Sequence, residues 1–273
     1  MTAKNTANLA SLRHELKSGD LVFFQGIAAD SVLIRDITGG SWSHCAMIIK
    51  GDDIGYSDHE LLLFESSVTP GKDIGHNGKA GSEKAGVMLV NFDQRMEDYA
   101  KSKEYSAFGI RQLDPAQAGK ADVNKLKAFA LNQNIRNSVY PAEHLVAAGH
   151  FVARELENEQ FTEYTVAKIK SEVRGDVISK LPDGELKQII EKTIEAAQDN
   201  IDHTAQDKIS HSHAITSHYF CSELIADALM HMGIMHIGNA AGSSPSDLSD
   251  DVESPLDTFY LDIKHLPGDL VGA

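Results

Sequence analysis

Short apolar runs separated by turn residues constrain the fold of this chain more than any other feature. Strand-sized apolar runs occur at residues 21–24, 42–49, 61–65, 87–92, 107–113 and 259–263. The link at residues 51–57 is too short for a helical crossover, so the second and third runs are expected to pair as an antiparallel hairpin. The order is strands, helices and a closing strand. We therefore expect an α+β fold built on an antiparallel sheet.

Helical periodicity marks other parts of the chain. Apolar spacing predicts helices at residues 5–17 and 122–134. It also predicts a third helix with an apolar stripe formed by Leu224, Ile225, Ala228, Leu229 and Met232. Residues 142–216 are charged and helix-forming, which predicts a helical subdomain that packs on itself. Residues 70–86 hold five glycines and several lysines without the spacing of a phosphate-binding loop, and predict a long mobile surface loop.

The composition and net charge argue against some classes of binding partner and cellular location. The net charge of -15 argues against nucleic acid or an anionic membrane surface as the main partner. Two cysteines in 273 residues do not form a disulfide framework, which favours a reducing compartment. The first residues lack the apolar segment of a secretory signal, and no run approaches the about 20 apolar residues of a membrane span. We expect a soluble, cytoplasmic protein without a transmembrane segment.

Thiol chemistry is the strongest functional signal. Cys221 falls on the first turn of the third helix, where unpaired N–H groups and the helix dipole favour a thiolate. His44 begins a strand, and alternation places it on the face opposite Cys45, so we expect Cys45 to lie apart from His44. Glu65 ends the neighbouring strand, where its carboxylate can orient an imidazole. A catalytic set requires that these distant residues meet in the fold.

Five segments in this order resemble the signatures of circularly permuted papain-fold proteins, the YiiX-like branch of the NlpC superfamily. They are Gly19-Asp20-Leu21-Val22-Phe23, Ser43-His44-Cys45-Ala46-Met47-Ile48, Phe64-Glu65-Ser66, Phe220-Cys221-Ser222-Glu223-Leu224 and Ser244-Pro245-Ser246-Asp247-Leu248. The resemblance covers about residues 18–113 and 217–250. It implies a permuted papain-like catalytic domain at residues 1–141 and 217–273, with an inserted helical subdomain at residues 142–216.

The same resemblance implies roles for single residues. Cys221 corresponds to the nucleophile, His44 to the base and Glu65 to the residue that orients the imidazole. Tyr140 is similar to a tyrosine that the family places before the cysteine, although the aspartate that usually follows it is absent here. Tyr140, Ser43 and Ser222 are thus candidates for substrate or oxyanion binding. The family uses no cofactor, and no metal is expected at this site.

These parts predict a thiol hydrolase that cleaves an amide, isopeptide or lipid ester through a thioester. Three alternatives stay open. An acyltransferase uses the same site when an amine or alcohol replaces water. An interaction protein uses the helical insertion to bind a protein partner, with the papain-like core as a scaffold. A metal-binding module would use histidines near Cys221, namely His203, His211, His213 and His218.

Overall fold

The computed structural model describes residues 8–75, 78–138, 140, 219–235, 240, 243–251 and 254–268. They build one six-stranded sheet in the order β4-β3-β2-β1-β5-β6, and every neighbouring pair is antiparallel. The expectation of an α+β fold with an antiparallel sheet is confirmed. The strands are β1 (Leu21–Gly26), β2 (His44–Lys50), β3 (Leu61–Ile74), β4 (Ala80–Asn91), β5 (Tyr105–Arg111) and β6 (Lys264–Pro267).

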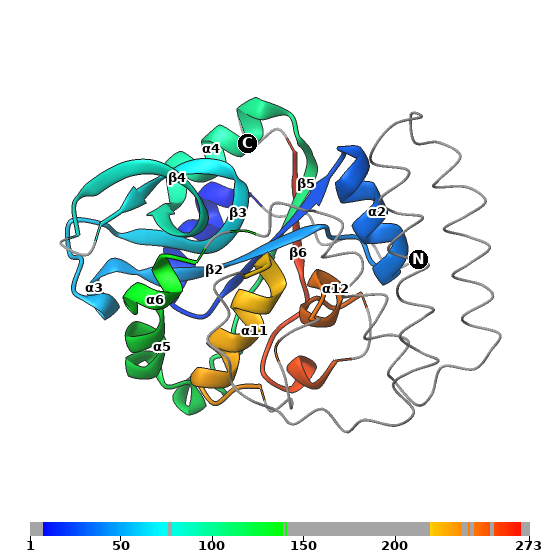
Figure 1. Ribbon diagram of the computed structural model, residues 1–273. Helices are drawn as coiled ribbons and strands as arrows, with labels where there is room; N and C mark the ends of the chain where they lie inside the picture. The colour runs from blue at the N-terminus through cyan, green and yellow to red at the C-terminus, as the bar shows by residue number, and fades with distance from the viewer. Residues whose placement is uncertain are drawn as a thin grey trace, which may run out of the picture.

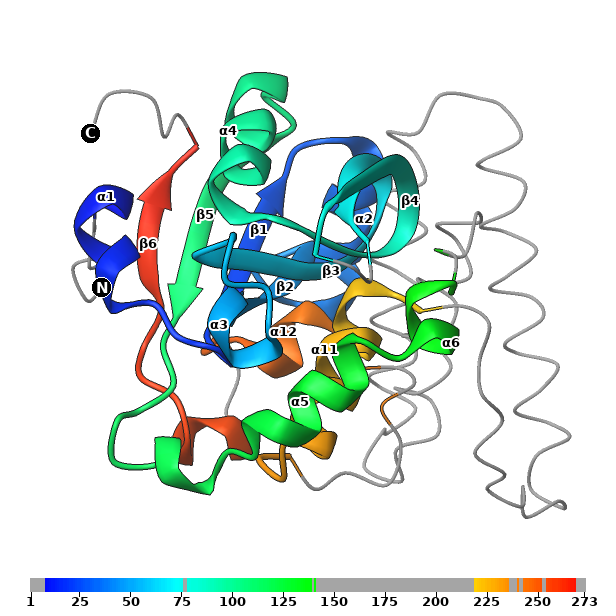
Figure 2. The same ribbon diagram turned by 90° about the vertical axis from the view of Figure 1, so that its left-hand side faces the viewer.

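Helices cover both faces of the sheet. Among the described residues they are α1 (Leu9–Leu12), α2 (Ala29–Thr38), α3 (Gly51–Ile54), α4 (Phe92–Ser102), α5 (Val123–Ala130), α6 (Gln133–Arg136), α11 (Cys221–His231) and α12 (Pro245–Leu248) (Figure 1). Figure 2 shows α4 on one side of the sheet and α5 with α11 on the other. Both faces are thus buried, which explains why the strands are continuous apolar runs.

Side-chain alternation divides the core into two clusters. Phe23 and Met47 point to the α11 side, where they join Leu224 and Leu229. The other cluster, on the α4 side, contains Val22, Phe24, Ala46, Ile48, Leu63, Met88, Phe92, Met96 and Tyr99. Strands β1 to β4 therefore supply both clusters, and the position of a side chain along its strand decides on which face of the sheet it packs.

The Gly19-Asp20 turn fastens the start of β1 to its neighbours. Gly19 has a φ of 97°, a conformation that favours glycine, and its N–H donates to the carbonyl of Ile48 at 2.9 Å. The buried carboxylate of Asp20 accepts the N–H groups of Leu113 at 2.8 Å and Lys17 at 2.9 Å. This part of the family-like sequence is therefore structural, and it sets the position of β1 beside β2 and β5.

Residues 70–86 differ most from the expectation. The predicted mobile loop is wrong, because β3 continues to Ile74, β4 starts at Ala80, and the two strands pair along most of this stretch. The register shifts between Ser67 and Gly71 and again near Ile74. Several side chains of this ribbon are exposed, so the stretch carries little of the apolar periodicity by which strands are recognised.

Three other predicted elements also differ from the structure. The predicted last strand at residues 259–263 is wrong: this stretch follows a 3-10 helix (Pro255–Thr258), contains one isolated bridge from Tyr260 to Leu113, and precedes β6. The predicted helix at residues 122–134 divides into α5 and α6. The leading helix is limited to α1 and a 3-10 turn (Arg13–Glu15).

The predicted helical insertion, residues 142–216, lies outside the described residues, as do the four histidines of the metal-binding alternative. Within the described ranges, no helix is both long enough and apolar enough to cross a membrane.

Candidate active site

The site lies where strands β2 and β3 separate. Their pairing runs from Lys50–Leu61 to Met47–Phe64 and stops there, while β2 continues back to His44. Helix α11 packs against both strands and begins at Cys221. The Ser66 hydroxyl donates to the carbonyl of Tyr219 at 2.6 Å, which ties the chain before α11 to β3. The nucleophile candidate therefore lies beside the end of β2 that pairs with β1 but no longer with β3.

His44 and Glu65 lie on the same face of the sheet and contact each other. The distance from His44 Nε2 to Glu65 Oε2 is 2.8 Å. The exposed fraction is 8% for His44, 5% for Cys221 and 0% for Glu65, so the carboxylate lies deepest. His44 is also close enough to Cys221 for each group to shift the pKa of the other. Because Nε2 faces Glu65, Nδ1 is the ring nitrogen available to the sulfur. The structure thus brings together the three residues predicted for the catalytic set.

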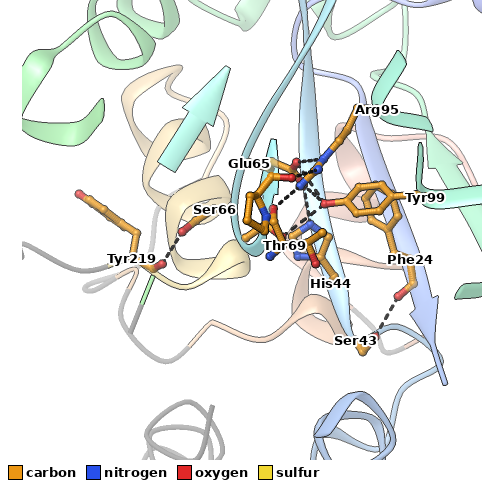
Figure 3. A network of polar contacts seen from close by, with 11 residues as sticks. Phe24, Ser43, His44, Glu65, Ser66, Thr69, Arg95, Tyr99 and Tyr219 are labelled. Atoms are coloured by element: carbon orange, nitrogen blue, oxygen red, sulfur yellow. Dashed lines mark hydrogen bonds and ion pairs between the residues drawn. The ribbon is translucent and has the colours of Figure 1, made fainter. Parts of the chain in front are cut away.

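Two residues of α4, Arg95 and Tyr99, contact the Glu65 carboxylate, as Figure 3 shows. Arg95 Nε donates to Glu65 Oε1 at 2.7 Å, and the Tyr99 hydroxyl lies 2.9 Å from Oε2 and 3.1 Å from Oε1. The remaining guanidinium nitrogens of Arg95 donate to the carbonyls of Thr69 and Pro70 at 2.7 and 2.8 Å. Glu65 is therefore fixed by three side chains.

These contacts keep Glu65 ionised inside the protein. Burial alone raises the pKa of a carboxyl group, but the charge of Arg95 and the hydrogen bond from His44 outweigh it and hold the pKa of Glu65 below its ordinary value. A buried carboxylate beside an imidazole favours the protonated ring. Glu65 is thus placed to fix the orientation of His44 and to stabilise its positive charge.

Cys221 and His44 form a thiolate–imidazolium pair. The Cys45 thiol has the largest effect on the pKa of Cys221. Together with His44 and the Cys45 backbone N–H it lowers the Cys221 pKa well below 9.0, although burial opposes the shift. Burial lowers the pKa of His44, but the Cys221 thiolate and Glu65 raise it to about 9. Between these two pKa values the sulfur is negative and the ring is positive, as a thiol nucleophile requires.

The position of Cys45 corrects one expectation. Alternation does place Cys45 in the α11-side core, on the face opposite His44. The prediction that Cys45 lies apart from the site is nevertheless wrong, because its thiol and its backbone N–H both lie close enough to Cys221 to lower the pKa of that sulfur. Cys45 lies beyond the last β2–β3 pair, so the edge of β2 at Cys45 is not covered by β3 and the Cys221 sulfur can approach it.

The other three candidates have different surroundings. Buried Ser43 accepts the N–H of Gly26 at 2.9 Å and donates to the Phe24 carbonyl at 3.2 Å. The Ser222 hydroxyl donates to the Ser243 carbonyl. Both hydroxyls therefore join segments of backbone, and a role in binding substrate stays a prediction.

Tyr140 lies near Cys221 through an aromatic contact. Its ring packs edge-on against Phe220, the residue before Cys221, with 5.6 Å between the ring centroids. Tyr140, Phe220 and Ile34 form a small cluster beside the start of α11. This position is compatible with the predicted role near substrate.

Sequence reasoning missed Arg95 and Tyr99 because it assigned no helix after the fourth strand. A signal for α4 is present. Asn91 caps it by accepting the Gln94 N–H at 3.0 Å, and the buried residues Phe92, Met96, Tyr99 and Ala100 recur at helical spacing. That spacing identifies the helix but does not show that it faces Glu65.

Neither the protein-family models searched nor the curated proteins searched match this chain. A functional proposal therefore depends on the geometry of the site.

Proposed function

We propose that this chain is a thiol-dependent hydrolase of permuted papain-like fold that cleaves an acyl bond in a peptide or lipid. The observation that carries the proposal is one imidazole ring that contacts both a thiol at a helix start and a buried carboxylate. The residues occur in the order histidine, glutamate, cysteine, as in the permuted family that the sequence resembles. The antiparallel sheet and the position of α11 against β2 and β3 are compatible with that fold.

The proposed first step forms a thioester. The Cys221 thiolate attacks the carbonyl carbon, and the backbone N–H of Cys221, at the start of α11, donates to the developing oxyanion. His44 imidazolium gives its proton to the leaving amine or alcohol as the C–N or C–O bond breaks. Glu65 keeps the ring oriented and stabilises its charge before the transfer.

The second step releases the acyl group. Neutral His44 accepts a proton from water, the resulting hydroxide attacks the thioester carbonyl, and the C–S bond breaks to return the thiolate. The acid product and the thiolate–imidazolium pair remain. When an amine or alcohol replaces water, the same sequence of bonds transfers the acyl group to that acceptor.

An activated acyl ester such as p-nitrophenyl acetate tests the proposal without knowledge of the natural substrate. The wild-type protein is expected to release nitrophenol in a burst and to carry one acetyl group on Cys221, which intact-mass and peptide mass spectrometry detect. Cys221→Ser removes both signals. His44→Ala lowers the rate by about a hundred- to ten-thousandfold, the usual contribution of a general acid–base residue.

His231→Ala is the matched control, since His231 lies on α11 with a half-exposed side chain bonded to the Asp227 carbonyl. It should retain the burst. Acetylation at a different residue, or an unchanged rate in His44→Ala, refutes the proposed mechanism. Capture of the acetyl group by an added primary amine in preference to water identifies a transferase.

A further inference from the structure

The chain has two cysteines, and the fold brings them into contact although they are far apart in sequence. Cys45 is the second residue of β2 and Cys221 the first residue of α11, and both lie in the α11-side core. Neither forms a disulfide in this structure. Helix α11 packs against β2, and each thiol is among the groups that shift the pKa of the other, so the two sulfurs are neighbours.

The two sulfurs differ in protonation. The pKa of Cys221 is lowered by Cys45 and by His44, so Cys221 is the more nucleophilic sulfur of the pair. The pKa of Cys45 is raised, first because it is buried and then because it lies beside the Cys221 thiolate. Thiolates react with hydroperoxides and protonated thiols do so slowly. Oxidation is therefore expected to begin at Cys221.

Solvent exposure also indicates that Cys221 is oxidised before Cys45. Cys221 retains 5% exposure, whereas Cys45 has none. A peroxide or a reductant from solution thus reaches Cys221 first. Redox-sensing cysteines characteristically combine a low-pKa, accessible thiol with a second cysteine beside it that resolves the oxidised form.

We propose that Cys45 is a resolving thiol that converts hydroperoxide-oxidised Cys221 into a reversible Cys45–Cys221 disulfide. In the first step the Cys221 thiolate attacks a peroxide oxygen, the O–O bond breaks, and an alcohol or water leaves with a proton from solvent. Cys221 becomes a sulfenic acid, oxidised by the two electrons that the peroxide gains. In the second step the Cys45 sulfur displaces the sulfenic hydroxyl, its own proton leaves with that hydroxyl as water, and the S–S bond forms.

The disulfide has two consequences. It removes the nucleophile while it exists, and it prevents further oxidation of Cys221 to sulfinic and sulfonic acids, which ordinary thiols do not reverse. Because Cys45 is fully buried, a thiol reductant is expected to attack the Cys221 sulfur and release Cys45. These steps require only the thiol pair and do not depend on which acyl bond, if any, the site cleaves.

Intact-mass spectrometry tests the proposal without a substrate. Dilute wild-type protein is treated with a small excess of hydrogen peroxide, then denatured, and its free thiols are counted. We expect the mass to fall by two hydrogen atoms, both thiols to disappear together, and one peptide pair joining Cys45 and Cys221 to appear after digestion. A phosphine reductant should restore both thiols.

Three variants complete the test. In Cys45→Ser and Cys45→Ala, Cys221 should gain two or three oxygen atoms that the phosphine does not remove. In Cys221→Ser, Cys45 should stay reduced at the same peroxide dose. Circular dichroism checks that each variant is folded. The cross-linked peptide is measured on wild-type protein, so that part of the test does not depend on the folding of a variant.

Oxygenated Cys221 with a free Cys45 thiol in the wild-type protein overturns the proposal, as does a disulfide found between two chains. Failure of the ester assay with normal disulfide formation would refute the hydrolase alone.

Discussion

Replacing Arg95 tests whether α4 controls the reactivity of a thiol on the other face of the sheet. Arg95 is 4% exposed and donates to Glu65 at 2.7 Å and to the carbonyls of Thr69 and Pro70. Arg95→Met removes one partner of a buried ion pair, which destabilises proteins by about 3–5 kcal/mol because the other charge is left without compensation. Urea denaturation should show a loss of this size.

The same substitution should change the thiol. Without Arg95, burial raises the pKa of Glu65, and a protonated Glu65 no longer stabilises His44 imidazolium. The pKa of His44 should then fall from about 9 and the pKa of Cys221 should rise. Iodoacetamide labelling of Cys221 in mildly acidic buffer should slow by about tenfold for each pKa unit gained by the thiol.

Arg136→Met is the matched control. Arg136 is 2% exposed and pairs with Asp73 at 2.5 Å, but it contacts none of the three site residues in the described structure. Its loss should lower stability to a similar extent and leave the pH dependence of Cys221 labelling unchanged. Equal labelling profiles in both variants and the wild type would show that Arg95 does not act through Glu65. A double variant with Glu65→Gln should recover part of the lost stability, since both charges are then absent.

Three further changes have defined outcomes. The kcat/KM for an anilide or an alkyl ester, whose leaving group needs a proton, should fall as pH rises past about 9, because His44 loses that proton; a rate that keeps rising excludes this role. Burial raises the pKa of Asp20 to about 6, so the native state binds more protons than the unfolded state, and the free energy of unfolding should fall as pH rises from 3.8 to about 6; urea titrations of Asp20→Asn should lack this slope. A Cβ at Gly109 would lie 2.8 Å from the Trp42 ring, so Gly109→Ala should cost about 1–3 kcal/mol of stability in thermal unfolding, whereas Gly119→Ala, with open space around it, should be near neutral.

The strands were predictable because both faces of the sheet are buried. A strand covered on two sides needs apolar residues at nearly every position, as in Leu21, Val22, Phe23 and Phe24, and this local property is visible in a linear sequence. The paired ribbon at residues 70–86 has no such run. It is held together by backbone hydrogen bonds between β3 and β4, which leave no apolar pattern in the sequence. Its prediction as a loop failed for that reason.

The candidate residues were predictable to different extents. Cys221 at a helix start and His44 at a strand start are local features, and their positions were predicted. Arg95 and Tyr99 carry no local sign that they hold Glu65. Their contact requires α4 to pack on the His44 side of the sheet, which depends on the long-range arrangement of strands and helices.

By itself, the sequence determined which residues alternate between the two faces of each strand and where the helix of Cys221 begins, because these follow from backbone geometry over a few residues. Only the tertiary structure decided that β2 and β3 separate after Met47 and Phe64, which lets Cys221 contact neighbours from both faces. Alternation alone had set Cys45 apart from that sulfur. Strand alternation describes where a side chain points within a continuous sheet, and it no longer excludes a contact where two neighbouring strands separate.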